Sequence, residues 1–445
     1  MTPASAPARV CVALPVRDGR AYFAQAIESV LAQADVDVEV RVLDNGSTDG
    51  SLELAREYAA RDPRVIAAAN PFDLTYYGSL NRALAETGCE FFVPFASDDV
   101  MYPGNLACKV HALRATGAAL ASSTADQIAP DGTPLGTVCP DHSTTARLTL
   151  APGFFRRLIP ANFISCQSVV VRTDALRAVG GFDVRSYYAA DWLAWLRLSL
   201  RHAFATLPEP LIANRMHAAT ITHSGSMAGL NGRDVPATLE HAFGDERLPD
   251  AWRPLRDTMV SISYQIVATS LHEAGIRRVA DGWASYTALL RALARTPGDH
   301  GLRERLQALM AESGLAPASV PLEVVGDAPR DAGEAAALAA ALAELRPLTG
   351  RVLLAVDDDD AREAANLLEP WRGDALPEVV LATGETTAAL LRPGRLALAR
   401  WGDELVARAE DAGVPVFPYA MPDPFAAAPD PARFETLDPA AALAA

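Results

Sequence analysis

The first hundred residues alternate between segments typical of strands and of helices, and this alternation constrains the fold more than any other feature. Apolar runs at residues 10–16, 38–43, 65–69 and 91–95 indicate buried strands. Between the first two, apolar residues recur at helical spacing from Phe23 to Leu31. Strands that alternate with helices form βαβ units, so the sequence predicts an α/β fold with a mostly parallel, doubly wound sheet.

Charged residues follow these strands. Arg17 and Asp18 follow the first strand, Asp44 the second, and Asp98 and Asp99 the segment FFVPFASDD. Ligands of such sheets bind beyond the carboxyl ends of the strands, so we expect these side chains to gather at one site. Adjacent strand residues point to opposite faces, which predicts that one acid binds a divalent cation while the other accepts a hydrogen bond from a sugar.

Purely structural roles are the alternative for these acids and for nearby polar residues. Asp98 would cap a helix opening near Pro103, and Asp99 would simply be solvated. Ser47 or Thr48 is expected to cap a helix beginning near Leu52.

Downstream, the pattern predicts a hairpin at 118–137, a short helix at 153–158, a strand through 171 with a helix at 173–179, and a strand ahead of Arg215. Asp191 opens a long helix, where it either caps the helix or reaches into a pocket. His217 is either a metal or diphosphate contact or a structural residue. Trp192 and Trp195 are core residues or platforms for a sugar, with the core favoured.

The segments ALPVRDGRAYFAQAIESVLAQ, VRVLDNGSTDGS and FVPFASDDVMYPGNL resemble the nucleotide-binding half of a family 2 glycosyltransferase of GT-A fold, over residues 8–225. The departures are Asp18 where the family usually has Asn, Ser97-Asp98-Asp99 in place of Asp-x-Asp, and Ala190-Asp191 in place of Glu-Asp.

This resemblance implies an inverting transfer of a sugar from a nucleotide-sugar donor to an acceptor hydroxyl, in the synthesis of a polysaccharide or glycoconjugate. It implies that Asp44 binds the base, that Asp98 binds the ribose, and that Asp191 is the general base. It also implies Mg²⁺ or Mn²⁺ on Asp99, with His217 as a second metal ligand. The implied nucleotide-binding residues are Pro15, Arg17, Asp18, Asp44 and Asp98.

The chain of 445 residues is too long for one ordinary core. We expect a catalytic domain at 1–226, a helical linker or bundle at 227–316 that opens with a Gly-rich linker or loop at 227–234, a small Rossmann-like α/β domain at 317–425 and a flexible tail at 426–445. The small domain has no GxGxxG fingerprint. The acids at 357–360 are interpreted as a solvated helix start rather than a metal site.

The formal net charge of −16 disfavours nucleic acid as a partner. The five cysteines lack CxxC spacing, which argues against a zinc site or a disulfide framework. The sequence shows no convincing signal peptide and no apolar run of 18 residues, so we expect a cytoplasmic protein, with peripheral binding at the inner face of the membrane as an option. The acceptor is a glycan, a lipid-linked glycan or a protein, and a homodimer through the helical segment or the C-terminal domain is open.

Two other functional classes stay open at this point. One is a nucleotide-sugar-binding or scaffold protein without turnover. The other is a nucleotidyltransferase or dinucleotide-dependent oxidoreductase on a similar sheet, the latter disfavoured because the glycine fingerprint is absent.

Overall fold

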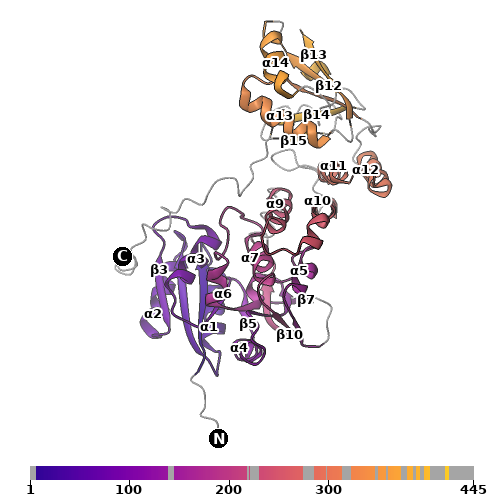
Figure 1. Ribbon diagram of the computed structural model, residues 1–445. Helices are drawn as coiled ribbons and strands as arrows, with labels where there is room; N and C mark the ends of the chain where they lie inside the picture. Colours follow the sequence, from indigo (N-terminus) through magenta and orange to yellow (C-terminus); the bar gives the residue numbers. More distant parts are fainter. Residues whose placement is uncertain are drawn as a thin grey trace. The chain divides into compact units, whose positions relative to one another are not determined.

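The computed structural model describes residues 7–138, 145–217, 220, 230–273, 285–296, 298–312, 322–345, 349–356, 359–371, 378–383, 387–390, 395–400 and 416–419. The chain divides into two compact units (Figure 1). The first holds residues up to 223 together with 241–249, and the second holds most of the remainder. Each unit is described by itself.

The first unit is built on a ten-stranded sheet with the strand order β3-β2-β1-β4-β9-β6-β10-β5, with β7 paired to β6 and β8 to β10. The four strands from β3 to β4 run parallel, as do β6 and β10, while β9, β5, β7 and β8 pair antiparallel. The predicted mostly parallel α/β sheet is therefore confirmed. Its strands are β1 (Arg9–Val16), β2 (Asp37–Asp44), β3 (Val65–Ala69), β4 (Phe91–Pro94), β5 (Val100–Met101), β6 (Leu120–Ile128), β7 (Pro134–Val138), β8 (Arg147–Thr149), β9 (Val169–Arg172) and β10 (Phe204–Arg215).

Helices cover the sheet and bury the faces that the sequence predicts. In α1 the buried residues include Phe23, Ile27 and Val30. In β4 both faces are buried, as expected for a strand inside a sheet covered on both sides. The helices of this unit are α1 (Arg20–Leu31), α2 (Ser51–Arg61), α3 (Thr75–Glu86), α4 (Asn105–Thr116), α5 (Gly153–Leu158), α6 (Thr173–Ala178) and α7 (Ala190–Ser199), with the short η1 (Cys166–Ser168).

Three predictions about helix ends and loops are wrong. α2 begins after Gly50, at φ 87°, and neither Ser47 nor Thr48 caps it; these two residues bond to Asp18, while the N–H of Ser51 donates to the Asp49 carboxylate. α4 likewise begins after Gly104, so Asp98 caps no helix there. The segment expected as a Gly-rich loop is helical from residue 230 onward, within α9 (Leu230–Phe243). A glycine in the left-handed region starts both α2 and α4, which side-chain patterning alone does not reveal.

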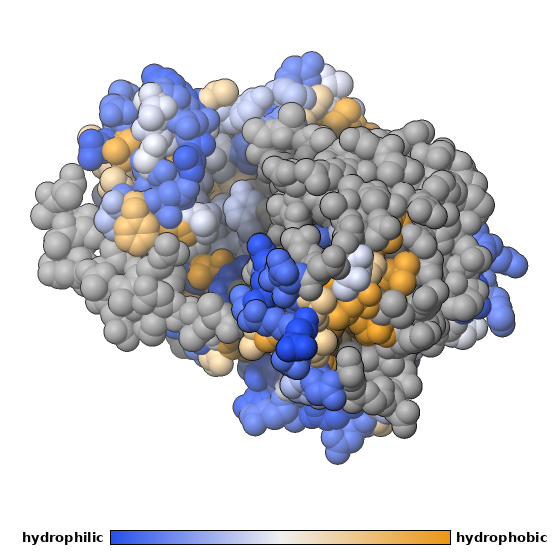
Figure 2. Space-filling model, turned by 90° about the horizontal axis from the view of Figure 1, so that it is seen from above, coloured by the Kyte–Doolittle hydropathy of each residue, from blue (hydrophilic) through white to orange (hydrophobic). Residues whose placement is uncertain are grey.

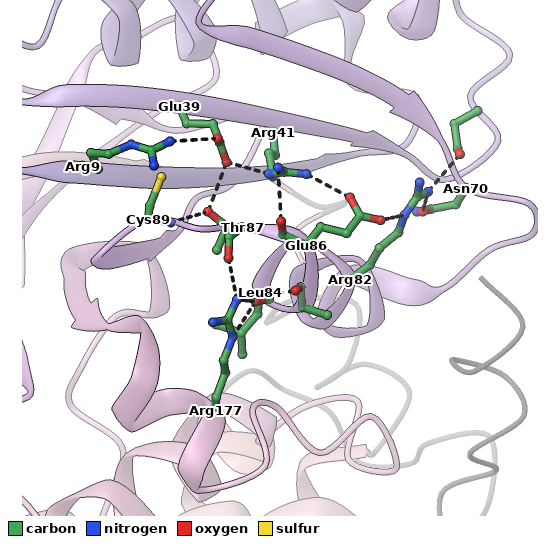
Figure 3. Close-up of polar contacts among 12 residues, drawn as sticks. Arg9, Glu39, Arg41, Asn70, Arg82, Leu84, Glu86, Thr87, Cys89 and Arg177 are labelled. Carbon is green, nitrogen blue, oxygen red and sulfur yellow. Dashed lines mark hydrogen bonds and ion pairs between the residues drawn. The ribbon is translucent and has the colours of Figure 1, made fainter. Parts of the chain in front are cut away.

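An ion-pair network braces the sheet against α3 (Figure 3). The guanidinium of Arg41 on β2 donates to Glu39 and to Glu86, at 2.7 and 2.9 Å. Arg82, only 4% exposed, also donates to Glu86 and reaches the side-chain oxygen of Asn70 at 2.7 Å. Because these groups are largely buried and doubly bonded, the network fixes α3 to the loop that follows β3.

The second unit combines helices with a small parallel sheet. Its helices include most of α9, then η2 (Asp250–Leu255), α10 (Arg256–Glu273), α11 (Ser285–Arg295) and α12 (His300–Glu312). Its sheet has the order β13-β12-β11-β14-β15, with every pairing parallel. The predicted second α/β sheet is confirmed. Its elements are β11 (Leu322–Asp327), α13 (Ala332–Leu345), β12 (Thr349–Val356), α14 (Ala361–Leu368), η3 (Glu369–Trp371), β13 (Glu378–Thr383), α15 (Thr387–Leu390), β14 (Arg395–Arg400) and β15 (Val416–Tyr419).

Some predictions fall on residues that are not described. The helix expected near 404–409, the tail from 426, Asp357 and Asp358 lie outside the described residues. Asp360 stands at the start of α14 but makes no side-chain cap hydrogen bond there.

The visible surface of the described residues is largely hydrophilic, with apolar residues gathered in patches (Figure 2). Large hydrophobic side chains that are more than a third exposed include Phe72, Leu135, Leu150 and Met216. Among the described residues, no helix combines the length and apolar character needed to cross a bilayer.

Candidate active site

Asp44 ends β2 with its carboxylate almost fully enclosed, at 1% exposure. Its Oδ2 accepts hydrogen bonds from the backbone N–H groups of Gly46 and Ser47, at 3.0 and 3.1 Å. Its Oδ1 is buried and has no hydrogen-bond partner. A buried carboxylate oxygen without a donor is costly, so this atom is suited to a ligand N–H.

The loops on either side of Asp44 are joined by an ion pair. Arg17 follows β1 and Asp73 follows β3, and their side chains pair while both stay substantially exposed. Since β2 lies between β1 and β3, the pair connects the two loops that flank the strand carrying Asp44. The loop after β3 is also bonded to Asn45, the residue that follows β2. Asn45 Oδ1 accepts hydrogen bonds from Asn70 Nδ2 and from the backbone N–H of Leu74.

Asp18 and Pro15 contribute to the same region as parts of the backbone frame. Asp18 has φ 48°, its N–H donates to Ser47 Oγ, and its carboxylate accepts a 2.7 Å hydrogen bond from the N–H of Thr48. Pro15 is buried in β1 opposite Leu43. The loop after β1 is therefore tied to the loop after β2.

Asp98 pairs with His217. Nε2 of His217 lies 2.8 Å from Oδ2 of Asp98, and both side chains are partly exposed, at 19% and 24%. The His217 ring also lies 5.5 Å from the Tyr22 ring, between centroids. Oδ2 of Asp98 and Nε2 of His217 are thus within hydrogen-bond distance of each other in two partly exposed side chains.

Asp99 is enclosed, in contrast with Asp98. Its Oδ1 accepts a hydrogen bond from the backbone N–H of Arg215 and its Oδ2 accepts one from Asn214 Nδ2, each at 2.8 Å. Burial, together with the charge of Asp98, raises the pKa of Asp99 to about 8. The sequence resemblance pairs Asp99 with His217 as metal ligands, whereas in the structure His217 faces Asp98 and Asp99 anchors β10.

Arg215 joins the backbone at Asp98 to the side chain of Gln25. Its Nε donates to the backbone oxygen of Asp98 at 2.9 Å, and its Nη2 donates to Gln25 at 2.7 Å. Its guanidinium lies 4.5 Å from the centre of the Tyr22 ring. Arg215 is only 3% exposed, so we identify it as a residue that positions Asp98.

Asp191 lies at the first turn of α7 and is 7% exposed. Its Oδ1 accepts a hydrogen bond from the backbone N–H of Trp192 at 2.7 Å, and its Oδ2 accepts one from Asn162 at 3.2 Å. Burial raises the pKa of Asp191 to about 6, against these bonds and a bond from Tyr77, which lower it. The N-cap of α7 is Ala189 and no side chain caps the helix, so the sequence alternative in which Asp191 caps α7 is wrong; the carboxylate is instead buried, with a raised pKa.

The three acids surround a common region. Burial and the charges of Cys166, Asp99, Asp98 and Asp191 raise the pKa of Tyr76 well above its usual value.

Trp192 and Trp195 are buried, at 3% and 0% exposure, so they are core residues as favoured from the sequence.

Sequence reasoning did not assign roles to Tyr22, Tyr77, Asn162 or Asn214, and it mentioned Arg215 only in passing. Each acts through a contact more than 20 residues away in the chain, and no local spacing signals such a contact.

Acidic side chains thus follow strands at one edge of a mostly parallel sheet, which is where ligands of such sheets bind. Residues 11–179 match the sequence family described as glycosyl transferase family 2. This match covers the N-terminal part of the chain, which is therefore similar to that family.

Two curated proteins are similar to this chain. An uncharacterized glycosyltransferase of Haemophilus influenzae is 23% identical over 199 residues, which is 44% of this chain and 62% of that protein. The Bacillus subtilis protein EpsE, named as a putative glycosyltransferase, is 29% identical over 99 residues, which is 22% of this chain and 36% of that protein. The chain thus spans less than two thirds of the length of either relative.

Among solved structures, residues 1–349 of TarS from S. aureus superpose with a TM-score of 0.49 and 16% identity, covering 68% of this chain and 83% of the other. The mannosyltransferase PcManGT from Pyrobaculum calidifontis, solved with GDP-Man and Mn²⁺, has a TM-score of 0.44 and 16% identity, covering 69% of this chain and 81% of the other.

Proposed function

We propose that the N-terminal unit is an inverting glycosyltransferase that moves a sugar from a nucleoside-diphosphate sugar to an acceptor hydroxyl. The observation that carries the proposal is that Asp98, Asp99 and Asp191 all lie close enough to Tyr76 for their charges to raise its pKa, while a fourth acid, Asp44, has one carboxylate oxygen without a hydrogen-bond partner among the described residues.

Asp44 is the proposed base-binding residue. Because its Oδ2 is already occupied by two backbone donors, only Oδ1 is left for a ligand. A single acceptor suits the one imino N–H of uracil or thymine, whereas guanine offers a pair of donors that would use both oxygens. We therefore expect UDP- or dTDP-sugars to bind in preference to GDP-sugars.

The donor set at Asp98 and His217 fits a divalent cation. A carboxylate oxygen and an imidazole nitrogen 2.8 Å apart, on two partly exposed side chains, are ligand types that Mn²⁺ and Mg²⁺ accept. Within the described residues no group of three or more such side chains gathers, so the diphosphate would have to supply further ligands. When bound, the cation would neutralise charge on the departing diphosphate. We place it on Asp98 and His217, with Asp99 as a positioning residue.

Asp191 is the proposed general base. The acceptor oxygen attacks the anomeric carbon, the bond from that carbon to the phosphate oxygen breaks, and the hydroxyl proton passes to the Asp191 carboxylate. One displacement inverts the anomeric carbon and releases a nucleoside diphosphate. With a pKa of about 6, the carboxylate is ionised at neutral pH but is a better base than an exposed aspartate.

The remaining assignments are also proposals. We propose that the helices of 227–316 and the α/β domain of 317–425 serve acceptor recognition or self-association, and that the protein works in the cytoplasm on a glycan, lipid-linked glycan or protein acceptor.

A transfer assay tests the function. Purified protein is incubated with UDP-, dTDP- and GDP-sugars, Mn²⁺ and a panel of acceptors, and both nucleoside diphosphate and glycosylated product are measured. We expect Asp191→Asn to abolish transfer while nucleotide affinity is kept. Asp174→Asn is the matched control, since Asp174 opens α6 with the same bond to the next N–H (2.8 Å) but is exposed. Full transfer by Asp191→Asn would refute the assignment of the base.

A non-catalytic sugar-nucleotide-binding protein is the second candidate. It predicts donor affinity with neither release of nucleoside diphosphate nor transfer to any acceptor, so the same assay separates the two.

A further inference from the structure

A short loop between α5 and η1 contacts both sides of the candidate site. Near its start, Nδ2 of Asn162 donates a hydrogen bond to Oδ2 of Asp191, at 3.2 Å. Three residues later, Oγ of Ser165 donates to Oδ1 of Asn214 on β10, at 3.1 Å. Nδ2 of Asn214 in turn donates to Oδ2 of Asp99, at 2.8 Å. The loop therefore connects the proposed base to the enclosed acid that follows β4.

The loop is also bonded within itself. The side-chain oxygen of Asn162 accepts a 3.2 Å hydrogen bond from the backbone N–H of Ile164, whose side chain is buried. The backbone oxygen of Ser165 accepts hydrogen bonds from both the N–H and the hydroxyl of Ser168, which is fully buried. Asn162 and Ser165 thus stand on either side of a buried anchor, so the loop holds two acids of the site at a set separation.

The bonds at Asn214 have a defined direction. A hydroxyl has one proton to donate, and Ser165 Oγ lies 3.0 Å from Gln167 Oε1 as well as 3.1 Å from Asn214 Oδ1. Gln167 can turn its amide and donate to the hydroxyl oxygen, whereas Asn214 already directs its amide nitrogen at the Asp99 carboxylate. The Ser165 proton therefore belongs on Asn214, where it keeps the Asn214 N–H facing Asp99.

Asn162 acts on a carboxylate that is only 7% exposed. The backbone N–H of Trp192 donates to Oδ1 of Asp191 and Asn162 donates to Oδ2, so each carboxylate oxygen has a donor that fixes its direction. A base must be aligned with the proton that it takes, and a hydrogen bond to the charged form stabilises that form. Loss of the Asn162 amide would therefore free the carboxylate to rotate and make it harder to ionise.

We propose that Asn162 and Ser165 are positioning residues, and that the loop they share sets Asp191 and Asp99 relative to each other. The proposal rests on the function proposed above, in which Asp191 is the base. Asn162 acts through Asp191, whereas Ser165 acts through Asn214 on Asp99. Substitutions of the two residues should therefore change different steps of the reaction.

The first test measures transfer kinetics after substitution of Asn162. Asn162→Ala removes the donor, so we expect kcat to fall about tenfold while the KM of the donor sugar changes by less than about twofold. Asn162→Asp keeps the size of the side chain but places a second carboxylate against Asp191, so kcat should fall about a hundredfold. Asn366→Ala, at an exposed asparagine on α14, is the matched control. A residue that only fills space would tolerate Asp better than Ala, and that order of effects would overturn the role of Asn162.

The same kinetics test Ser165. Ser165→Ala takes away the donor that orients the Asn214 amide, so we expect the KM of the donor sugar to rise about three- to tenfold with a smaller change in kcat. Ser165→Thr retains a hydroxyl and should restore the wild-type KM. In an Asn214→Ala background, Ser165→Ala should add no further loss, because the bond is already absent. Equal losses in Ser165→Ala and Ser165→Thr would overturn the role of Ser165.

A last measurement depends on neither turnover nor ligand. Melting temperatures are compared at pH 8 in two double-variant cycles, Asn162→Ala with Asp191→Ala and Ser165→Ala with Asn214→Ala. In each cycle we expect the double variant to lose less than the sum of the two single losses.

The outcomes separate this proposal from the proposed function. Additive losses in both cycles, together with loss of transfer in Asp191→Asn, would refute the loop contacts and leave the base assignment standing. Non-additive losses together with full transfer by Asp191→Asn would refute the base assignment and leave the contacts standing.

Discussion

Nε2 of His217 lies 2.8 Å from Oδ2 of Asp98, whereas the two oxygens of the adjacent Asp99 are taken up by Asn214 and by the backbone of Arg215. The two neighbouring acids therefore have different environments. Asp98 is available to a ligand from solvent, and Asp99 secures the end of β10.

The first prediction separates these two acids. Asp98→Asn and His217→Ala should weaken the dependence of activity on Mn²⁺, each raising the Mn²⁺ concentration for half-maximal activity by at least about tenfold, while the melting temperature changes little. Asp99→Leu should instead lower the melting temperature by several degrees, since it leaves Asn214 and the Arg215 N–H without an acceptor. Titration of activity with Mn²⁺ and thermal unfolding measure the two effects. An unchanged Mn²⁺ concentration for half-maximal activity in Asp98→Asn would contradict the placement of the cation.

The second prediction concerns the free oxygen of Asp44. In Asp44→Asn the amide oxygen must face the N–H groups of Gly46 and Ser47, so the NH₂ group replaces Oδ1 and meets the base as a donor. UDP affinity should fall by about 10- to 100-fold. Calorimetric titration with UDP, dTDP and GDP measures this loss. Asp37→Asn, at the exposed opposite end of β2, is the control, and stronger binding of GDP than of UDP by the wild type would contradict the argument.

The third prediction uses the ion pair between Arg17 and Asp73. If Arg17 contacts the nucleotide, Asp73 competes with it. Asp73→Asn should then tighten nucleotide binding by about two- to fivefold, while Arg17→Ala should weaken it. The double variant should bind like Arg17→Ala. Dissociation constants at 50 and 300 mM salt would show the effect shrinking as screening increases. Tighter nucleotide binding by Arg17→Ala would show instead that the ion pair hinders access of the nucleotide to Asp44.

The fourth prediction concerns Lys109, the one lysine of the chain. It is fully buried on α4, with its Nζ 3.0 Å from Asn105 Oδ1, and burial lowers its pKa to about 7. Below pH 7 the folded protein must hold a buried charge, so stability should rise between about pH 7 and 10 as the proton is lost from the folded state first. Lys109→Met should raise the melting temperature by several degrees at pH 6 and by less at pH 9. Equal effects at both pH values would contradict a charge-based cost.

Much of the fold was predictable because the spacing of apolar residues in the sequence matches the faces that are buried in the structure. The runs at 10–16 and 91–94 are apolar on both faces, as strands inside a covered parallel sheet must be, and Phe23, Ile27 and Val30 lie on the buried face of α1. The end of α6 was also predictable, because a Gly-Gly pair is typical of a helix end. Gly180 and Gly181 both adopt positive φ in the structure. The starts of α2 and α4 were not, because each begins after a glycine and not at a side-chain cap.

The candidate site was predictable in its residues but not in its pairings. Position after a strand singles out Asp44, Asp98 and Asp99, yet only tertiary structure decides which of the last two faces His217. That pairing depends on β10, because its residues Asn214 and Arg215 donate hydrogen bonds to both carboxylate oxygens of Asp99. The family resemblance implied the role of Asp191, and no local pattern indicated that Asn162, 29 positions earlier, would donate a hydrogen bond to it.

The order in which the chain leaves the ribosome has a bearing on when this site exists. Asp98 and Asp99 are synthesised more than a hundred residues before β10, which pairs with both β6 and β5 and supplies the groups that hold them. Until β10 docks, β5 lacks its antiparallel neighbour and the buried acid lacks its donors. A chain stopped before residue 204 would therefore carry both acids without the strand whose residues Asn214 and Arg215 bond to Asp99.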